Sequence, residues 1–192
     1  ENETSQIKTM NKPNMTIEGI KNIKTVGTLV ASSRYLSKKI LRGIDFSKQL
    51  TVVELGGGNG AITRNILDRL SPGSELHSFE VLPKFYNELS KIQDSRLKVH
   101  NSCLSETKLL KEGDVDVVIS CLPIANFNES LKDTIFSKVK YLLKEEGKFR
   151  QFQYSLIDYR YVRDCFDNLN MDYCLFNIPP AFIYKSKNIN PA

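Results

Sequence analysis

The chain has 192 residues, 41% of them hydrophobic, which suits a single α/β domain with a substantial core. No apolar run is long enough to span a bilayer. The four cysteines form no C-x-x-C pair, and no histidine cluster lies beside them. The sequence therefore predicts reduced cytosolic thiols, and neither a disulfide framework nor a metal site.

The positive charge is concentrated at the N-terminal end. The formal net charge is +5, and the first 50 residues hold nine Lys or Arg against four Asp or Glu, whereas residues 51–192 hold 18 of each sign. Residues 1–14 are polar, which is typical of a disordered segment. We therefore expect an N-terminal segment, residues 1–48, ahead of a charge-balanced domain, residues 49–192.

Two short amphipathic helices are predicted within the N-terminal segment. Isoleucines recur every three residues over 17–23, and a second apolar stripe over 36–44 follows the N-cap pair Ser32-Ser33. The basic residues lie mostly off these stripes: Lys21, Lys24, Arg34, Lys38, Lys39 and Arg42. Such helices can be docked on the domain, can lie on an anionic membrane or can bind nucleic-acid phosphates, and composition leaves these three possibilities open.

The most informative stretch of the chain is Thr51–Gly60, in which a β-branched and apolar run ends in Glu54 and a glycine cluster follows. An amphipathic helical pattern comes next, so the order is strand, glycine-rich turn, helix. Glycines let the backbone approach a ligand closely, and the helix N-terminus offers free N–H groups, which together build a nucleotide-binding corner. Gly56, Gly58 and Gly60 give the spacing G-x-G-x-G, which differs from the dinucleotide fingerprint G-x-G-x-x-G.

A second acid stands at the distance expected for a ribose ligand. Leu76–Glu80 reads as a strand that ends in an acid, 26 residues after Glu54. In a doubly wound sheet this spacing places Glu80 at the tip of the neighbouring strand, where its carboxylate can accept hydrogen bonds from both ribose hydroxyls. The alternative is an exposed acid at a strand end.

The rest of the chain alternates strands and helices. Helices are predicted at 60–70, 83–92, 129–143 and 158–169, and strands at 50–55, 75–80, 96–100, 115–121, 147–154, 171–178 and 181–186. This order predicts an α/β fold with a three-layer, Rossmann-like sheet of seven mostly parallel strands. The strand at 115–121 is expected to be central and to end at the same crevice as the glycine loop.

Five segments, taken in order, resemble those of bacterial phospholipid N-methyltransferases. They are residues 25–33, Val53–Gly60, Ser120-Cys-Leu-Pro123, Gln151-Phe-Gln-Tyr154 and Asn177-Ile-Pro-Pro-Ala181. The second segment is shared by S-adenosylmethionine (SAM)-dependent methyltransferases in general, and the last three are more specific. The chain departs from the family pattern at Ala31, where proline is usual, at Gln153, where threonine is usual, and at Asn101, where an acid usually lies near adenine.

The resemblance implies methyl transfer from SAM to the amine of a membrane phospholipid, from phosphatidylethanolamine toward phosphatidylcholine, with S-adenosylhomocysteine (SAH) as product. The partners that it implies are an anionic membrane surface and the amino-phospholipid substrate, with neither nucleic acid nor a metal. It implies a cytoplasmic enzyme held peripherally at the inner face of the cytoplasmic membrane. The choice between an ethanolamine and an ornithine head group, the number of methyl groups added and the oligomeric state are left open.

The residues expected in the site fall into four groups. SAM binding is expected from Glu54, Gly56, Gly58, Gly60, Glu80, Asn101, Ser102 and Ser120. The catalytic residues that would orient the acceptor amine are Tyr35, Ser120, Gln151 and Tyr154. The substrate-binding residues are Ser33, Leu122, Pro123 and Asn177. Contact with the membrane surface is expected from Lys21, Lys24, Lys38 and Lys39.

Two rival activities remain. An adenine-N6 methyltransferase acting on rRNA or another nucleic acid shares the leading helix and the glycine loop, but it carries N/D-P-P-Y/F or N-L-P-Y after the fourth strand to grip a flipped base. This chain has Ser120-Cys-Leu-Pro-Ile124 there, and its similar Asn177-Ile-Pro-Pro180 lies two strands too late. A soluble small-molecule methyltransferase also fits the glycine corner.

Overall fold

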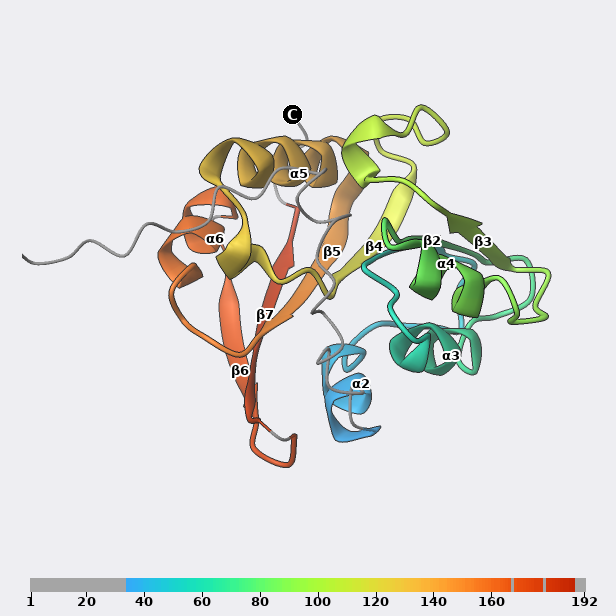
Figure 1. The fold of residues 1–192 in the computed structure, drawn as a ribbon, viewed down its shortest axis with the longest axis horizontal. Coiled ribbons are helices and arrows are strands. Elements are labelled where there is room, and N and C mark those ends of the chain that lie inside the picture. Colours follow the sequence, from blue (N-terminus) through green and yellow to red (C-terminus); the bar gives the residue numbers. More distant parts are fainter. Residues whose placement is uncertain (1–33, 167, 178, 189–192) are drawn as a thin grey trace, which may run out of the picture.

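The computed structural model describes residues 34–166, 168–177 and 179–188 (Figure 1). Ser33, Lys21 and Lys24 lie outside these ranges, as do the helix predicted near residues 17–23 and the segment 25–33. None of the helices in the described ranges has the length and hydrophobicity needed to cross a membrane.

Seven strands form one sheet, in the order β3-β2-β1-β4-β5-β7-β6. Their bounds are β1 Thr51–Leu55, β2 Glu75–Phe79, β3 Leu97–His100, β4 Val115–Ser120, β5 Leu143–Gln153, β6 Asn170–Cys174 and β7 Ala181–Lys187. All neighbours pair in parallel except β7, which is antiparallel to both β5 and β6. The predicted seven-stranded, mostly parallel Rossmann-like sheet is thereby confirmed.

The strand order reverses at β1, which pairs with β2 on one side and with β4 on the other. The carboxyl ends of β1 and β4 are therefore the place where an open α/β sheet forms its ligand crevice. The predicted helices following β1, β2, β4 and β5 are all present. The helices are α2 Arg34–Ile40, α3 Ala61–Leu67, α4 Pro83–Leu89, α5 Glu129–Leu142 and α6 Tyr159–Cys165, with 3₁₀ turns at Leu104–Glu106 and Ile124–Asn126.

Helices cover both faces of the sheet, which explains why its central strands are apolar on both sides. Helices α5 and α6 pack on one face, in a buried cluster that includes Val53, Val118, Phe149, Ile135 and Val162. Helices α2 and α3 pack on the other face, in a second cluster that includes Val52, Ile119, Leu36, Ile40 and Ile66. The result is the three-layer arrangement in Figure 1.

Two strands differ in length from the prediction. Strand β5 begins at Leu143, directly after α5, because Leu143 pairs with Val115 and is buried. Strand β6 ends at Cys174, short of the predicted residue 178, where its last pair is Cys174 with Ala181. The intervening Pro179-Pro180 has no backbone N–H to donate, so the ladder cannot extend farther into the turn.

Helix α2 is held on the sheet by polar contacts as well as by its buried leucine and isoleucine. The Lys39 ammonium donates to the Tyr173 carbonyl and lies 3.1 Å from Asp172 Oδ1. Near the end of the helix, Lys148 Nζ donates to the Gly43 carbonyl at 2.6 Å. Lys39 is therefore engaged by β6, whereas Lys38 is exposed. The membrane role expected for both lysines stays a prediction.

Replacing Asp172 by Asn is expected to loosen this docking, lowering the free energy of unfolding by about 1 kcal/mol at neutral pH. Burial opposes ionisation, but hydrogen bonds from Lys185 and Lys39 hold the pKa of Asp172 at about 2, below its ordinary value of 3.8. The stabilisation is therefore present above pH 3.8 and is lost as the pH falls through about 2. Urea denaturation at neutral pH and near pH 2 measures this change in the free energy of unfolding.

The matched control for this experiment is Asp164→Asn, which removes an ion pair to Arg163 whose side chains are both largely exposed. An exposed pair contributes little, so this variant should unfold like the wild type. Equal losses of stability in the two variants would contradict a specific role for Asp172 in docking α2.

Candidate active site

The glycine loop follows β1 and leads directly into α3. Gly56, Gly58 and Gly60 adopt φ angles of 74°, 54° and 79°, a region that favours glycine. The Gly56 N–H donates to the Phe79 carbonyl at 2.8 Å, which ties the loop to the end of β2. A Cβ on Gly58 would meet no atom within 4 Å, so the loop faces open space there.

Gly57, which the spacing argument passed over, is the most tightly packed residue of the loop. A Cβ at this position would lie 2.4 Å from Ser78 Oγ and 2.8 Å from Leu89 Cδ1. Only the absence of a side chain lets the loop settle against β2 and α4. Its place in the middle of three consecutive glycines, Gly56 to Gly58, was the signal that could have identified it.

Glu54 lies fully buried beneath the loop. Its Oε2 accepts hydrogen bonds from Thr63 Oγ1 and Ser78 Oγ, each at 2.7 Å. Burial raises the pKa of Glu54, and the two hydroxyl donors oppose that rise. These contacts tie β1, β2 and α3 together, so the geometry supports a positioning role for Glu54 under the glycine loop.

Glu80 follows β2 and is almost fully buried, which excludes the alternative of an exposed strand-end acid. Its Oε2 accepts from the Gly58 N–H at 3.0 Å and its Oε1 from the Leu82 N–H at 2.9 Å. Burial raises the pKa of Glu80, against the effect of these N–H donors. Each carboxylate oxygen has a further acceptor position, so the group can bind ligand hydroxyls while it holds the loop.

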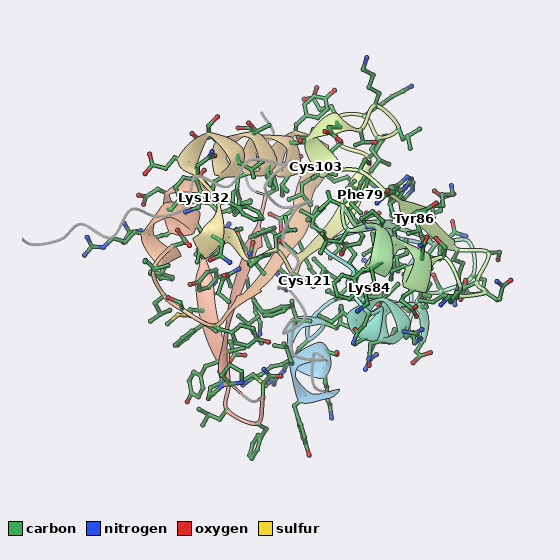
Figure 2. The ribbon with its side chains drawn as sticks, in the orientation of Figure 1. Phe79, Lys84, Tyr86, Cys103, Cys121 and Lys132 are labelled. Atoms are coloured by element: carbon green, nitrogen blue, oxygen red, sulfur yellow. The ribbon has the colours of Figure 1, made fainter. Side chains whose placement is uncertain are left out.

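An apolar pocket lies between the glycine loop and α5. It is lined by Gly56, Glu80 and Ser102, and by apolar side chains that include Phe79, Leu122 and Ile135. Phe79 and Cys103, labelled in Figure 2, both belong to its wall. Asn101 lies beside it and donates from Nδ2 to the Glu80 carbonyl at 2.8 Å. An apolar wall next to a carboxylate and a glycine loop has the chemical character that an adenosine group requires.

On the other side of the crevice, the ends of β4 and β5 are joined through one carbonyl. The Leu122 oxygen accepts from Gln151 Nε2 at 3.1 Å and from Gln153 Nε2 at 2.7 Å, while the Leu122 N–H lies 3.5 Å from Ser120 Oγ. The structure therefore brings Ser120, Leu122 and Gln151 together. Gln151 Oε1 is buried and has no hydrogen-bond partner among the described residues.

Tyr154 and Asn177 form a second polar group on this side. Burial raises the pKa of Tyr154, and a hydrogen bond with the Asn177 side chain opposes the rise. Asn177 is buried, and its Nδ2 donates to the Pro179 carbonyl at 2.8 Å. Tyr35 is largely exposed, with its ring 5.5 Å from that of Phe176. Pro123 is half-buried at the start of the 3₁₀ turn.

Cys121 links the two sides of the crevice and occupies the centre of Figure 2. Burial, together with the nearby Glu54 and Glu80 carboxylates, raises the pKa of this thiol well above its ordinary value. The Cys121 N–H donates to the Leu55 carbonyl beside the glycine loop at 2.8 Å, and the carbonyl of the next residue, Leu122, accepts from Gln151 and Gln153. The cofactor side and the acceptor side are therefore adjacent. The described residues bring no three His, Cys, Asp or Glu side chains together as a metal site would require.

Comparison with known proteins gives two matches that cover different lengths of the chain. The family model described as ribosomal RNA adenine dimethylase matches residues 25–112, which include the glycine loop and Glu80 but end before β4. The ornithine lipid N-methyltransferase of Singulisphaera acidiphila is 30% identical over 171 residues, which cover 85% of this chain and 89% of that protein. The second likeness therefore extends well beyond the cofactor half.

Solved structures share the fold. The SAM-dependent O-methyltransferase of Thermotoga maritima has a TM-score of 0.66 at 14% identity, covering 92% of this chain and 72% of that one. The 1,6-didemethyltoxoflavin-N1-methyltransferase of Burkholderia thailandensis, solved with SAH, has a TM-score of 0.65 at 13% identity, covering 84% and 79%. The chain belongs to the SAM-dependent methyltransferases, in one family with the ornithine lipid N-methyltransferase of S. acidiphila, and its cofactor is SAM.

Proposed function

We propose that this enzyme transfers methyl groups from SAM to the amine of a membrane lipid head group. The observation that carries the proposal is the 30% identity to an ornithine lipid N-methyltransferase over 85% of the chain, which extends beyond the cofactor half. The sequence motifs favour phosphatidylethanolamine, and that relative is named for an ornithine lipid. Both lipids present an amine, so the proposal names that shared chemistry and the test separates the two head groups.

On the cofactor side, we assign Glu80 to the ribose hydroxyls, Gly56–Gly60 to the close approach of the backbone, and Ser102 with Asn101 to the surroundings of adenine. When bound, SAM supplies an electrophilic methyl group on a sulfonium. The burial of Glu80 and its two N–H donors support this assignment, because they fix an acid at the loop in a low-dielectric place.

On the acceptor side, the chain must orient an amine whose nitrogen is free of its extra proton. Removing that proton costs about 1.4 kcal/mol for each pKa unit above the working pH. Gln151 Oε1, a buried acceptor without a described partner, can take a hydrogen bond from the amine. Tyr154, held by Asn177, can offer a ring face to a methylated ammonium. Proximity and orientation then supply most of the catalysis.

Glu80→Ala is expected to weaken SAH binding by roughly one to two decades, because a hydrogen bond to a charged group contributes about 1.5–3 kcal/mol. The matched control is Glu75→Ala, at the opposite end of β2, where Glu75 pairs with Lys98 at 2.7 Å. Calorimetry should give wild-type affinity for Glu75→Ala. Wild-type affinity for Glu80→Ala would remove Glu80 from the binding site.

The SAH affinity of the wild type, measured by calorimetry, should also depend on pH. The pKa of Glu80 lies above its ordinary 4.5, so the carboxylate is lost as the pH falls through that raised value. SAH affinity should fall with it in the wild type. Glu54, whose pKa burial also raises, titrates too. In Glu80→Gln, the part of the pH dependence of SAH affinity that comes from Glu80 should be absent. The difference between this variant and the wild type therefore measures that part.

The main rival is methylation of an adenine in RNA, which the match of residues 25–112 supports for the cofactor half alone. We would incubate the protein with SAM labelled on the methyl group and separate samples of phosphatidylethanolamine, ornithine lipid, RNA and soluble amines. Label in either lipid supports the proposal and identifies the head group. Label in RNA alone, or in a soluble amine alone, would overturn it.

A further inference from the structure

The turn between β6 and β7 and the adjacent face of α2 expose large apolar side chains. Leu175 and Phe176 are 64% and 77% exposed, and Tyr35 and Tyr173 are also more than half exposed. The rings of Tyr35 and Phe176 contact each other across the gap between helix and turn. We call these four residues the hairpin–helix surface. Exposed apolar groups gathered in this way mark an interaction site.

The rim of this surface is cationic. A groove of about 460 Å³ between α2 and β6 is lined by the four residues and by Lys38, Lys39, Arg42 and Cys174. Asp172 pairs with Lys39, whereas Lys38 and Arg42 extend into solvent. Tyrosine rings, an exposed Phe and Leu, and lysines whose apolar stems can lie along them are the side chains that suit the head-group layer of a bilayer.

The surface also lies next to the acceptor side of the crevice. Phe176 is the most exposed of the four, and the next residue, Asn177, is buried against Tyr154. Figure 1 shows the β6–β7 turn and α2 projecting together beyond the end where β5 finishes. The chain therefore passes from the outer surface at Phe176 to the crevice at Asn177.

We propose that the hairpin–helix surface seats in an anionic bilayer, with Leu175 and Phe176 at the acyl boundary and Lys38 and Arg42 at the lipid phosphates. A lipid amine then reaches Asn177 and Tyr154 while its chains stay in the membrane. The inference rests on the proposed function, which supplies the reason to approach lipid, but bilayer binding is measurable without any turnover. The charge of the rim favours anionic lipid.

Fluorescence provides the first test, because the chain has no tryptophan. Phe176→Trp introduces a single reporter at the turn, and Leu109→Trp introduces one at a similarly exposed position (68%) in the loop before β4. On vesicles of phosphatidylglycerol and phosphatidylcholine, emission from residue 176 should shift to shorter wavelength and be quenched by brominated acyl chains. Emission from residue 109 should stay unchanged. Unchanged emission at both positions would overturn the proposal.

Substitution provides the second test. Leu175→Ser should lower vesicle binding about tenfold, whereas Leu109→Ser, an equally exposed leucine, should not. Both variants should keep wild-type SAH affinity, which shows that they are folded. Leu175→Ser should methylate lipid in vesicles more slowly but keep its rate on a short-chain, monomeric form of the same lipid. Equal vesicle binding by the two variants would contradict the proposal.

Other occupants give different results. If residues 1–33 cover this surface, the Phe176→Trp emission is blue-shifted without lipid and moves to the red when residues 1–33 are removed. If a second copy covers it, the shift depends on protein concentration. Either result overturns the bilayer proposal. If residue 176 enters vesicles but no lipid is methylated in any form, the proposed function fails and the docking surface stands.

Discussion

Gly57→Ala is expected to lower the free energy of unfolding by about 3 kcal/mol and to weaken SAH binding about tenfold or more. The new Cβ would lie 2.4 Å from Ser78 Oγ and 3.1 Å from Glu54 Oε2. Overpacking costs typically about 1–3 kcal/mol. If the Ser78 hydroxyl rotates away, the buried Glu54 carboxylate loses a donor, which costs about 1.5–3 kcal/mol. Chemical denaturation and calorimetry measure the two effects.

Two controls separate packing from backbone strain. Gly57 lies outside the left-handed region, so Gly57→Ala introduces the clash alone, whereas Gly113→Ala, at a φ of 67° and with no atom within 4 Å of the new Cβ, introduces backbone strain alone. The Gly113→Ala variant should lose only about 1 kcal/mol and should bind SAH normally. The double variant Gly57→Ala/Ser78→Ala should be less destabilised than the sum of its single variants, because the closest clash is removed. Strict additivity would contradict this account.

Tyr154→Ala is expected to reduce turnover about a hundredfold while it changes SAH affinity by less than about threefold. Tyr154 belongs to the acceptor side, where Asn177 holds it, and its loss removes a group that orients the amine. Tyr154→Phe removes only the hydroxyl, so its turnover should lie between that of the wild type and that of Tyr154→Ala. Tyr141→Ala, on the outer face of α5, serves as the aromatic control and should retain activity. Loss of turnover and affinity together would instead indicate a folding defect.

The element pattern was readable from the sequence because it depends on local periodicity. Strands β1 to β4 and the four helices of the α/β units were placed within a few residues, since apolar runs, helical stripes and glycine turns mark them. Glu80 was found by its distance from Glu54, because parallel strands end at a common edge. Sequence spacing missed the contacts between distant segments. These include the close packing of Gly57 against Ser78 and the hydrogen bond from Gln153 to the Leu122 carbonyl, 31 residues away.

The docking of Lys39 was missed for the same reason, whereas the early end of β6 is a local effect of Pro179-Pro180 at the turn. Lys39 is one of several basic residues along a helix, and only the fold brings Asp172, 133 positions later, against it. The hairpin–helix surface likewise combines residues from both ends of the described chain. Its apolar side chains carry no periodic pattern, so the sequence predicted membrane contact from the basic amphipathic N-terminal segment and from the family resemblance, and not from this surface.

The most direct measurement is the lipid and RNA content of cells that make this protein. Lipid extracts from cells with the wild-type enzyme should contain amino lipids heavier by one or more methyl groups, and extracts from cells with the Glu80→Ala variant should contain far less of them. The acceptor head group follows from fragmentation of those lipids. Unchanged lipids, together with additional N6-methyladenine in ribosomal RNA that depends on Glu80, would contradict the account.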